Sequence, residues 1–285
     1  MKKVFFAIIA LLCVSAFTVH GQNRHALLFG LGEQQDKSWG KINGDKDIDF
    51  AVKMLAEMGY ADIVTLKNEQ ATKAAMLAAF KELAAKCGKG DIVYVHYSGH
   101  GQMVTDLNGD ESFKWSGKHS MWDESWVPYD AYMVYCDKDK GEKHLTDDEV
   151  AASLTAIRER IGNEGELVVV VDACHSGDAT CGDRDVPVRG IGVKFCIPQD
   201  NSIPVEEPKK ELWLTVSACK PFQLNMEMKE PQVGKLTYAL YLMGKDAFEM
   251  DSEALQARLS EFMERHKGFL PQTPMVTGMK KISGE

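Results

Sequence analysis

Two short segments of the chain carry side chains that could act as a base and a nucleophile. Residues 95–101 read VHYSGHG and residues 171–177 read VDACHSG. A cysteine thiol becomes an effective nucleophile when an imidazole beside it takes its proton. His100 and Cys174 are therefore the predicted base and nucleophile. Backbone amides at Gly101 and Cys174 are the predicted donors to the oxyanion of a tetrahedral intermediate.

Each motif also has a less specific interpretation. A cysteine after an apolar strand is often an inert core residue, and a histidine in a glycine-rich turn is often an ordinary loop residue. The joint occurrence of both, each at the end of a strand and each followed by glycine, favours chemistry. His96 and His175 are the alternative bases. His96 lies within a strand, and His175 adjoins the thiol and would point elsewhere, so His100 is preferred.

Alternating strands and helices are expected to position these residues. Apolar patterns predict strands at 25–29, 61–66, 91–97, 167–171 and 212–217, and helices around 48–59, 71–86, 146–157, 237–243 and 255–263. Residues 274–277 are expected to close the sheet. The alternation predicts a parallel sheet covered by helices on both faces. Ligands bind beyond the carboxyl ends of such strands, where both motifs lie.

Two long segments have no sustained periodicity. Residues 102–143 are interpreted as loops and a hairpin. Residues 178–210 contain four prolines and are interpreted as an exposed linker.

The two motifs resemble those of the caspase-like cysteine peptidases, most closely the metacaspases and bacterial relatives of peptidase family C14. The matching residues are Tyr97–Gly101 and Asp172–Gly177, and the resemblance spans about residues 24–280. It implies a caspase-hemoglobinase fold: an α/β/α sandwich with a mostly parallel central sheet of about six strands. It also implies peptide-bond hydrolysis with His100 as general base and Cys174 as nucleophile.

The N-terminal sequence and the resemblance together suggest how the chain is divided. A signal peptide is expected at 1–21, followed by a caspase-like peptidase domain at 22–285. Within that domain we expect a large-subunit-like part at about 24–183, an exposed linker at about 184–210 and a small-subunit-like part at about 211–285.

The substrate is expected to be a protein or peptide with a basic residue at the cleavage site. Strand alternation places Asp172 on the side of Cys174, and Ser98 on the side of His100. A carboxylate beside the cleft favours a cationic side chain. Asp47 falls where the family has a second pocket acid, although residues 43–47 depart from the family's usual pattern there. Asp47, Ser98 and Asp172 are thus the predicted substrate-binding residues, for cleavage after Arg or Lys. The alternative role for Asp47 is to stabilise the dipole of the first helix.

Many metacaspases need calcium, and the aligned acids here are Asp123, Asp147 and Asp148. Carboxylate oxygens from separate loops suit calcium. Asp147 and Asp148 also follow the capping residue Thr146, so stabilisation of a helix N-terminus explains them equally well. The chemistry itself requires no cofactor, and calcium is expected only as an activator.

The predicted linker carries basic residues that a peptidase of this specificity would cut. Self-cleavage there would give large and small fragments. The candidates are Arg184, Arg189, Lys194, Lys209 and Lys210. Two other functions stay open: a catalytically silent binding module with the same fold, and a transpeptidase or ligase that uses the same dyad.

Composition and the N-terminus limit the location and the partners. The 285 residues carry a net charge of -9, which disfavours nucleic-acid binding. Two lysines followed by an apolar run at 4–14 predict a cleaved signal peptide, so the protein is expected to be exported, periplasmic or extracellular, with no membrane span afterwards. Six of the 7 cysteines lie beyond that peptide, and their pairing and the oligomeric state cannot be inferred from the sequence.

Overall fold

The structure is a computed structural model, and it describes residues 22–109, 122–174, 187–190, 192–198, 212–221 and 223–282. The predicted signal peptide at 1–21 lies outside the described residues. Within the described ranges, no helix combines the length and apolar content needed to cross a bilayer.

A six-stranded sheet forms the centre of the domain, with the strand order β2-β1-β3-β7-β8-β9. Its strands are β1 (Arg24–Gly30), β2 (Asp62–Lys67), β3 (Ile92–Ser98), β7 (Glu166–Asp172), β8 (Leu214–Ser217) and β9 (Met275–Gly278). Only β9 runs antiparallel to its neighbour in this sheet. The two central strands, β3 and β7, are buried almost throughout, as continuous apolar strands covered on both faces should be. The predicted α/β/α sandwich with a mostly parallel sheet is confirmed.

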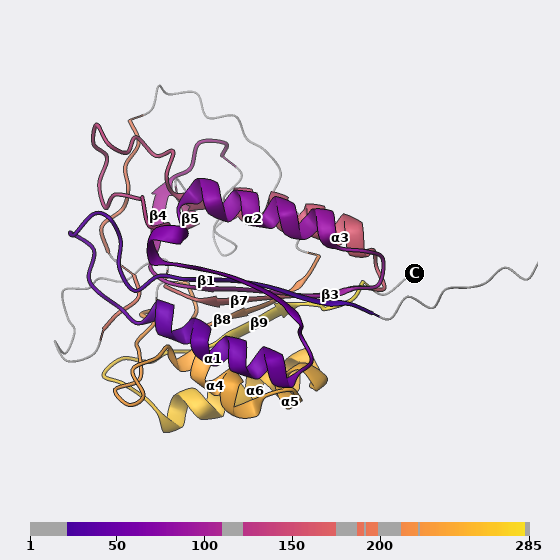
Figure 1. Ribbon diagram of the computed structural model, residues 1–285. Coiled ribbons are helices and arrows are strands. Elements are labelled where there is room, and N and C mark those ends of the chain that lie inside the picture. Colours follow the sequence, from indigo (N-terminus) through magenta and orange to yellow (C-terminus); the bar gives the residue numbers. More distant parts are fainter. Residues whose placement is uncertain are drawn as a thin grey trace, which may run out of the picture.

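Helices cover both faces of the sheet (Figure 1). One face carries α2 (Lys73–Lys86) and α3 (Asp147–Ile161), and the other carries α1 (Gly44–Glu57), α4 (Lys235–Met243), α5 (Asp246–Glu249) and α6 (Ser252–Arg265). Thr146 caps the start of α3, as the sequence predicts, and forms a capping box with Glu149. The Thr146 hydroxyl accepts from the Glu149 amide, and the Glu149 carboxylate accepts from the Thr146 amide.

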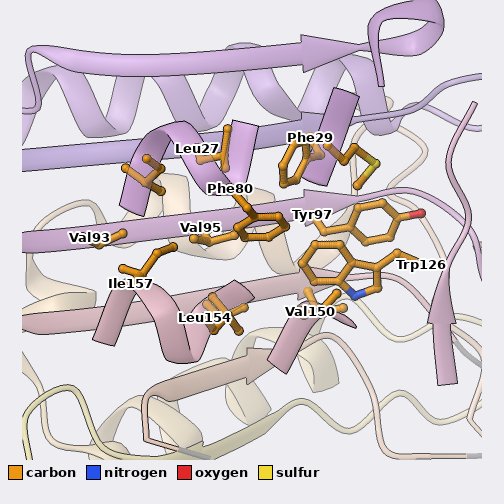
Figure 2. Packing of buried hydrophobic residues seen from close by; sticks show 14 of the residues in the cluster. Leu27, Phe29, Phe80, Val93, Val95, Tyr97, Trp126, Val150, Leu154 and Ile157 are labelled. Carbon is orange, nitrogen blue, oxygen red and sulfur yellow. The ribbon is translucent and has the colours of Figure 1, made fainter. Parts of the chain in front are cut away.

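An aromatic cluster between the sheet and helices α2 and α3 fixes the chain just after β3 (Figure 2). The rings of Tyr97 and Trp126 stack with centroids 4.5 Å apart. The Tyr97 hydroxyl donates to the backbone carbonyl of His100 at 2.5 Å and accepts from the amide of Val127 at 2.9 Å. The core therefore holds the backbone of the candidate base directly.

The register between β3 and β7 brings the two sequence motifs side by side. Ser98 is paired with Asp172, and His100 and Cys174 each follow two residues later. The Gly99 amide also donates to the Asp172 carbonyl at 3.4 Å. Both motifs thus lie at the carboxyl edge of adjacent parallel strands, where the sequence predicted them.

A small antiparallel sheet stands beside this edge. It comprises β4 (Gly101–Thr105), β5 (Trp122–Trp126) and β6 (Leu145–Thr146), with β5 in the middle. The β4 and β5 pair confirms the hairpin expected within 102–143. The three-residue helix η1 (Asn68–Gln70) and helix α5 have no clear pattern in the sequence.

The predicted linker is partly buried where the structure describes it, although residues such as Val193, Lys194 and Cys196 are exposed. Arg189 and Phe195 are fully buried. Phe195 extends the small sheet: its amide donates to Met103 at 2.8 Å, and its carbonyl accepts from Thr105 at 3.0 Å. The prediction of an exposed segment was wrong for these two residues. The prolines and charged residues of the segment indicate exposure, and nothing in the pattern marks the one aromatic and the one cation that are buried.

Candidate active site

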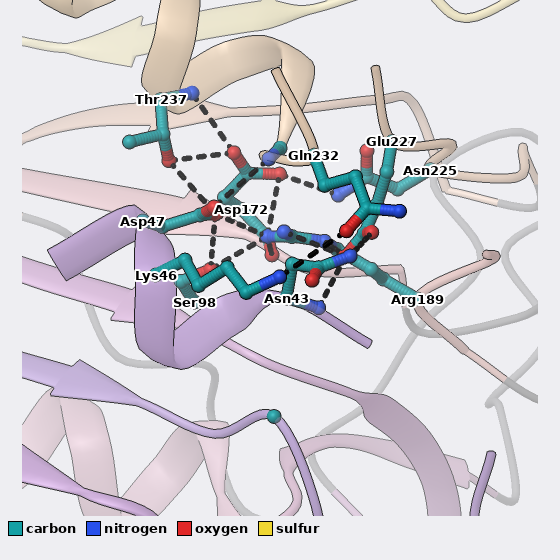
Figure 3. A network of polar contacts seen from close by, with 12 residues as sticks. Asn43, Lys46, Asp47, Ser98, Asp172, Arg189, Asn225, Glu227, Gln232 and Thr237 are labelled. Carbon is teal, nitrogen blue, oxygen red and sulfur yellow. Dashed lines mark hydrogen bonds and ion pairs between the residues drawn. The ribbon is translucent and has the colours of Figure 1, made fainter. Parts of the chain in front are cut away.

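The side chain of Arg189 fills the predicted substrate pocket (Figure 3). Its Nη1 lies 2.6 Å from Asp47 Oδ2, 2.5 Å from Ser98 Oγ and 3.4 Å from Asp172 Oδ1. The three predicted substrate-binding residues therefore converge on one guanidinium, and none of them is exposed to solvent. A cationic side chain is what such a set of acceptors selects.

Helix α1 brings Asp47 to this position by starting very close to the sheet. A Cβ on Gly44 would lie 2.5 Å from the carbonyl oxygens of both Leu31 and Ser98, so only glycine permits the approach. Asp47 follows one turn later and faces Ser98, whose hydroxyl donates to its carboxylate at 2.6 Å. Asp47 thus belongs to the pocket as well as to the first turn of the helix.

Two further residues, not predicted from the sequence, orient Asp172. The Asn225 amide donates to Asp172 Oδ1 at 2.7 Å, and both the backbone amide and the hydroxyl of Thr237 donate to Oδ2, at 2.8 and 2.7 Å. Burial alone would raise the pKa of Asp172, but Arg189 and these donors hold it below its usual value. Burial raises the pKa of Asp47 to about 6, against the attraction of Arg189.

A third acid, Glu227, was also missed. Its Oε1 lies 3.0 Å from Arg189 Nε and 2.9 Å from Nη2, and its side chain is fully buried. It lies in an irregular segment before α4 with no periodicity to mark it. Burial opposes the charge on Arg189, yet the surrounding acids raise the pKa of its guanidinium well above the usual value. The pocket residue is therefore a permanent cation.

The backbone around Arg189 is docked as an additional extended strand. Val188 forms an antiparallel bridge with Met226. The Arg189 amide donates to the Asn225 carbonyl at 2.9 Å, and the Glu227 amide donates to the Pro187 carbonyl at 3.2 Å. A peptide that binds by adding a strand is held through its main chain, and its side chain is then selected by a pocket.

The carbonyl of Arg189 lies against the candidate nucleophile. It accepts the backbone amide of Cys174 at 2.7 Å, and this amide is one of the two predicted oxyanion donors. A Cβ on Gly190 would lie 2.5 Å from the Cys174 carbonyl oxygen and 2.8 Å from its Sγ. The peptide bond between Arg189 and Gly190 thus passes directly beside the thiol, and glycine makes that approach possible.

The Cys174 thiol is buried and lies 3.0 Å from the carbonyl of Gln223. The Cys219 thiol approaches the same carbonyl at 3.4 Å. A hydrogen bond with Cys174, together with burial, raises the pKa of Cys219 well above its usual value, so Cys219 stays protonated. All five cysteines of the described residues, Cys87, Cys136, Cys174, Cys196 and Cys219, are free thiols.

The imidazole of His100 is oriented by the loop before α1. Its Nε2 lies 2.7 Å from the carbonyl of Gly40, and its ring lies 5.1 Å from that of Trp39. Because a carbonyl only accepts, Nε2 carries the proton, and Nδ1 keeps the free electron pair. Nδ1 is buried with no hydrogen-bond partner among the described residues. Burial lowers the pKa of His100 to about 4, so the ring is neutral and Nδ1 can accept a proton.

The structure describes one of the two alternative bases, His96. His96 is enclosed in β3, with Nδ1 3.1 Å from the Tyr94 hydroxyl and Nε2 3.1 Å from the Thr237 hydroxyl. His96 thus helps to hold Thr237, the threonine that orients Asp172. His175 lies outside the described residues. Gly101, the second predicted oxyanion donor, begins β4 opposite Trp126.

The predicted calcium ligands come from two neighbouring elements, β5 and α3. Ser125 pairs with Thr146, so Asp123 on β5 runs beside the first turn of α3, where Asp147 and Asp148 lie. Asn108 donates to Asp148 at 2.5 Å. Within the described ranges, no three His, Cys, Asp or Glu side chains converge as a metal site requires. We assign no step of the chemistry to calcium.

Comparison with known proteins identifies the family of this chain. The family model for the metacaspase, peptidase C14 domain matches residues 24–181. The chain belongs to this family. Metacaspase-1A of Aspergillus niger is 30% identical over 166 residues, covering 55% of this chain and 36% of that protein. Metacaspase-1 of Ajellomyces capsulatus is 32% identical over 171 residues, covering 55% and 41%. The chain therefore matches about two fifths of the length of these curated relatives.

Solved structures support the fold. A crystal structure of a Geobacter sulfurreducens protein aligns with a TM-score of 0.61 at 23% identity, over 92% of this chain and 95% of that one. Caspase-1 of Spodoptera frugiperda aligns with a TM-score of 0.59 at 13% identity, over 90% and 87%. The metacaspase chain described here thus has the caspase fold predicted from its sequence.

Proposed function

We propose that this metacaspase-family chain is a cysteine endopeptidase that hydrolyses peptide bonds after a basic residue, with Cys174 as nucleophile and His100 as base. One observation carries the proposal. A basic residue of the chain itself, Arg189, has its side chain in the acidic pocket, its carbonyl on the Cys174 amide and its following residue against the Cys174 sulfur.

These placements support the following reaction. His100 Nδ1 takes the thiol proton, and the sulfur of Cys174 attacks the carbonyl carbon that follows the basic side chain. The oxyanion forms on the carbonyl oxygen bonded to the Cys174 amide. The carbon–nitrogen bond breaks as the leaving amine takes the proton from the imidazolium. Water, deprotonated by the same imidazole, then hydrolyses the thioester and regenerates the thiol.

Fluorogenic peptides ending in Arg, Lys or Asp test this activity. We expect hydrolysis of the basic peptides only. Cys174→Ala should abolish it, and His100→Ala should slow it by about 100- to 10,000-fold. Hydrolysis that survives Cys174→Ala, or that is faster for the Asp peptide, would refute the proposal. A wild-type protein that hydrolyses none of the three peptides would be the silent binding module. An added amine nucleophile, followed by product mass, identifies the transpeptidase alternative.

The chain's own Arg189–Gly190 bond is the first substrate that we propose. Of the five linker candidates, Arg189 is held in the pocket, whereas Lys194 packs its ammonium 4.3 Å from the ring of Trp122. Arg184, Lys209 and Lys210 lie outside the described residues. Until the bond is cut, the side chain of Arg189 excludes an external substrate from the pocket.

Intact-mass spectrometry tests this self-cleavage. The wild-type chain should give fragments that meet between residues 189 and 190, and Cys174→Ala should stay whole. Lys194→Ala should cut as the wild type does, whereas Arg189→Ala should not cut at 189. A wild-type chain that stays whole, or that cuts at 194 instead, would show that the pocket does not present a substrate.

Export and calcium dependence complete the proposal. The apolar segment at 4–14 supports removal of a signal peptide. The mass of the chain recovered from the medium or periplasm tests this removal. We expect a mature chain whose first residue lies near Gln22. Peptide assays with added calcium and with a chelator test activation. Equal rates in both would leave Asp147 and Asp148 with only their helix-capping role.

A further inference from the structure

The pocket contacts the two ends of the guanidinium in different ways. Asp47, Ser98 and Asp172 all contact Nη1 of Arg189. Glu227 contacts the opposite edge of the guanidinium, where its Oε1 lies 3.0 Å from Nε and 2.9 Å from Nη2. The first group would serve any cation that reaches the end of the pocket. The second contact requires two donors on one rigid edge, which is a property of arginine.

Glu227 is also held by donors outside the docked segment. Asn43, the residue that precedes α1, donates its backbone amide to Glu227 Oε1 at 2.7 Å and its side-chain amide to Oε2. The Glu227 backbone forms a bridge with Gly234. Its side chain is fully buried. Both carboxylate oxygens are therefore held in place by protein donors, and the acid cannot turn to follow a differently shaped cation.

A lysine in the same pocket would leave this acid without its partner. A lysine ammonium is a single nitrogen that can replace Nη1 among Asp47, Ser98 and Asp172, but its stem has no donor at the position of Nε. The only cation paired with Glu227 in the described part of the chain is Arg189. A buried carboxylate that loses its cation is strongly unfavourable, and sites built for a donor reject analogues that lack it.

We propose that Glu227 is a specificity-determining residue that makes the pocket select arginine over lysine, with Asn43 as its positioning residue. This inference rests on the proposed function, since it concerns the residue after which the enzyme cuts. It narrows the substrate class from basic peptides to peptides with arginine at the cleavage site. It also assigns the discrimination to one residue outside the aspartate pair.

The test compares two fluorogenic peptides that differ only in Arg or Lys at the cleaved position. The quantity measured is the ratio of the two kcat/KM values, in which the fraction of active enzyme cancels. The wild type should favour arginine by about 100-fold, since the lysine peptide lacks two charge-assisted hydrogen bonds. Glu227→Gln should reduce the ratio to about 3-fold or less, mainly through loss of arginine cleavage.

Matched variants separate specificity from structural damage. Glu230→Gln, three residues later and exposed, should keep the wild-type ratio. Asn43→Ala should lower the ratio part of the way, because Glu227 then loses both donors. If Glu227→Gln folds poorly, the loss of active enzyme slows both peptides equally and does not alter the ratio, which should still fall to about 3-fold or less. Glu227→Asp, which keeps the charge but withdraws it, must also lower the ratio.

The outcomes distinguish the inference from the proposed function. Wild-type enzyme that cleaves neither peptide would refute the proposed function, and the inference with it. Cleavage of both peptides with the same ratio in wild type, Glu227→Gln and Glu227→Asp would refute the inference and leave the peptidase intact. A wild type that prefers lysine would also overturn the inference.

Discussion

Replacing Arg189 by methionine should destabilise the uncut protein strongly, although methionine matches the arginine stem in volume. The change is made in the Cys174→Ala background, so that no cleavage occurs. Three buried carboxylates, those of Asp47, Asp172 and Glu227, then share a pocket without their cation. Breaking a buried ion pair from one side costs about 3–5 kcal/mol, unlike the replacement of a whole pair by apolar groups, which is often neutral.

The cost has an upper limit set by the pocket itself. Burial already raises the pKa of Asp47 to about 6, so this acid takes up a proton readily when Arg189 is lost. The docked segment can also leave the pocket and admit water. We therefore expect about 3–5 kcal/mol for the whole cluster, not for each pair, which corresponds to a fall in Tm of roughly 6–20 °C in a domain of this size.

Thermal unfolding followed by circular dichroism measures the effect. Arg258→Met, at an exposed arginine whose partner is Glu261, is the matched control and should shift Tm by about 2 °C or less. The pH dependence has a definite sign. The pKa of Asp172 is lowered in the fold, so its stabilisation by Arg189 is present above its unfolded pKa and is lost as the pH falls through its folded value. The gap between parent and Arg189→Met should therefore narrow in acid. A Tm within about 1 °C of the parent at pH 7 would show that Arg189 does not occupy the pocket.

Three further changes test separate parts of the site. The acid limb of kcat for an arginine peptide, whose guanidinium takes the place of Arg189 in the pocket, should have its midpoint near pH 6, because protonation of Asp47 removes a charge from the pocket. Asp47→Asn should lower the rate and move the limb toward pH 4, where His100 gains its proton. An unchanged limb would exclude Asp47 from substrate binding. Gly190→Ala places a Cβ 2.8 Å from Cys174 Sγ and should slow self-cleavage at least 10-fold by intact mass, with external peptides unaffected once the chain is cut. Gly234→Ala places a Cβ 2.6 Å from Asp47 Oδ2, so arginine peptides should lose most of their kcat/KM; normal turnover would mean that the substrate binds elsewhere.

The central sheet, and the shared edge that carries His100 and Cys174, could be predicted because their signals are local. Continuous apolar runs mark β3 and β7, and in both strands the polar motif follows at once, so the shared edge follows from the rule for parallel sheets. The register that pairs Ser98 with Asp172 also agrees with the expected side of each side chain. These inferences require only strand periodicity and the order of elements.

The occupant of the pocket could not be predicted, because it depends on contacts between distant segments. Arg189 lies in a stretch without periodicity, and nothing in its neighbours distinguishes it from Arg184 or Lys194. Glu227 lies 38 residues away from it in another irregular stretch, and its position depends on Asn43 near the start of the chain. A buried cation needs several acids from separate elements, and a single sequence records no such pairing.

The most direct measurement of the central claim is the site of alkylation by an arginyl peptide chloromethyl ketone. Its guanidinium should enter the acidic pocket of the self-cleaved enzyme, and the sulfur of Cys174 should displace chloride to form a thioether. Peptide mapping should find the added mass on Cys174, at a rate far above that of the aspartyl analogue and strongly reduced in Asp172→Asn. An adduct on another residue, or equal labelling by the arginyl and aspartyl probes, would contradict a nucleophile at Cys174 served by a pocket for basic side chains.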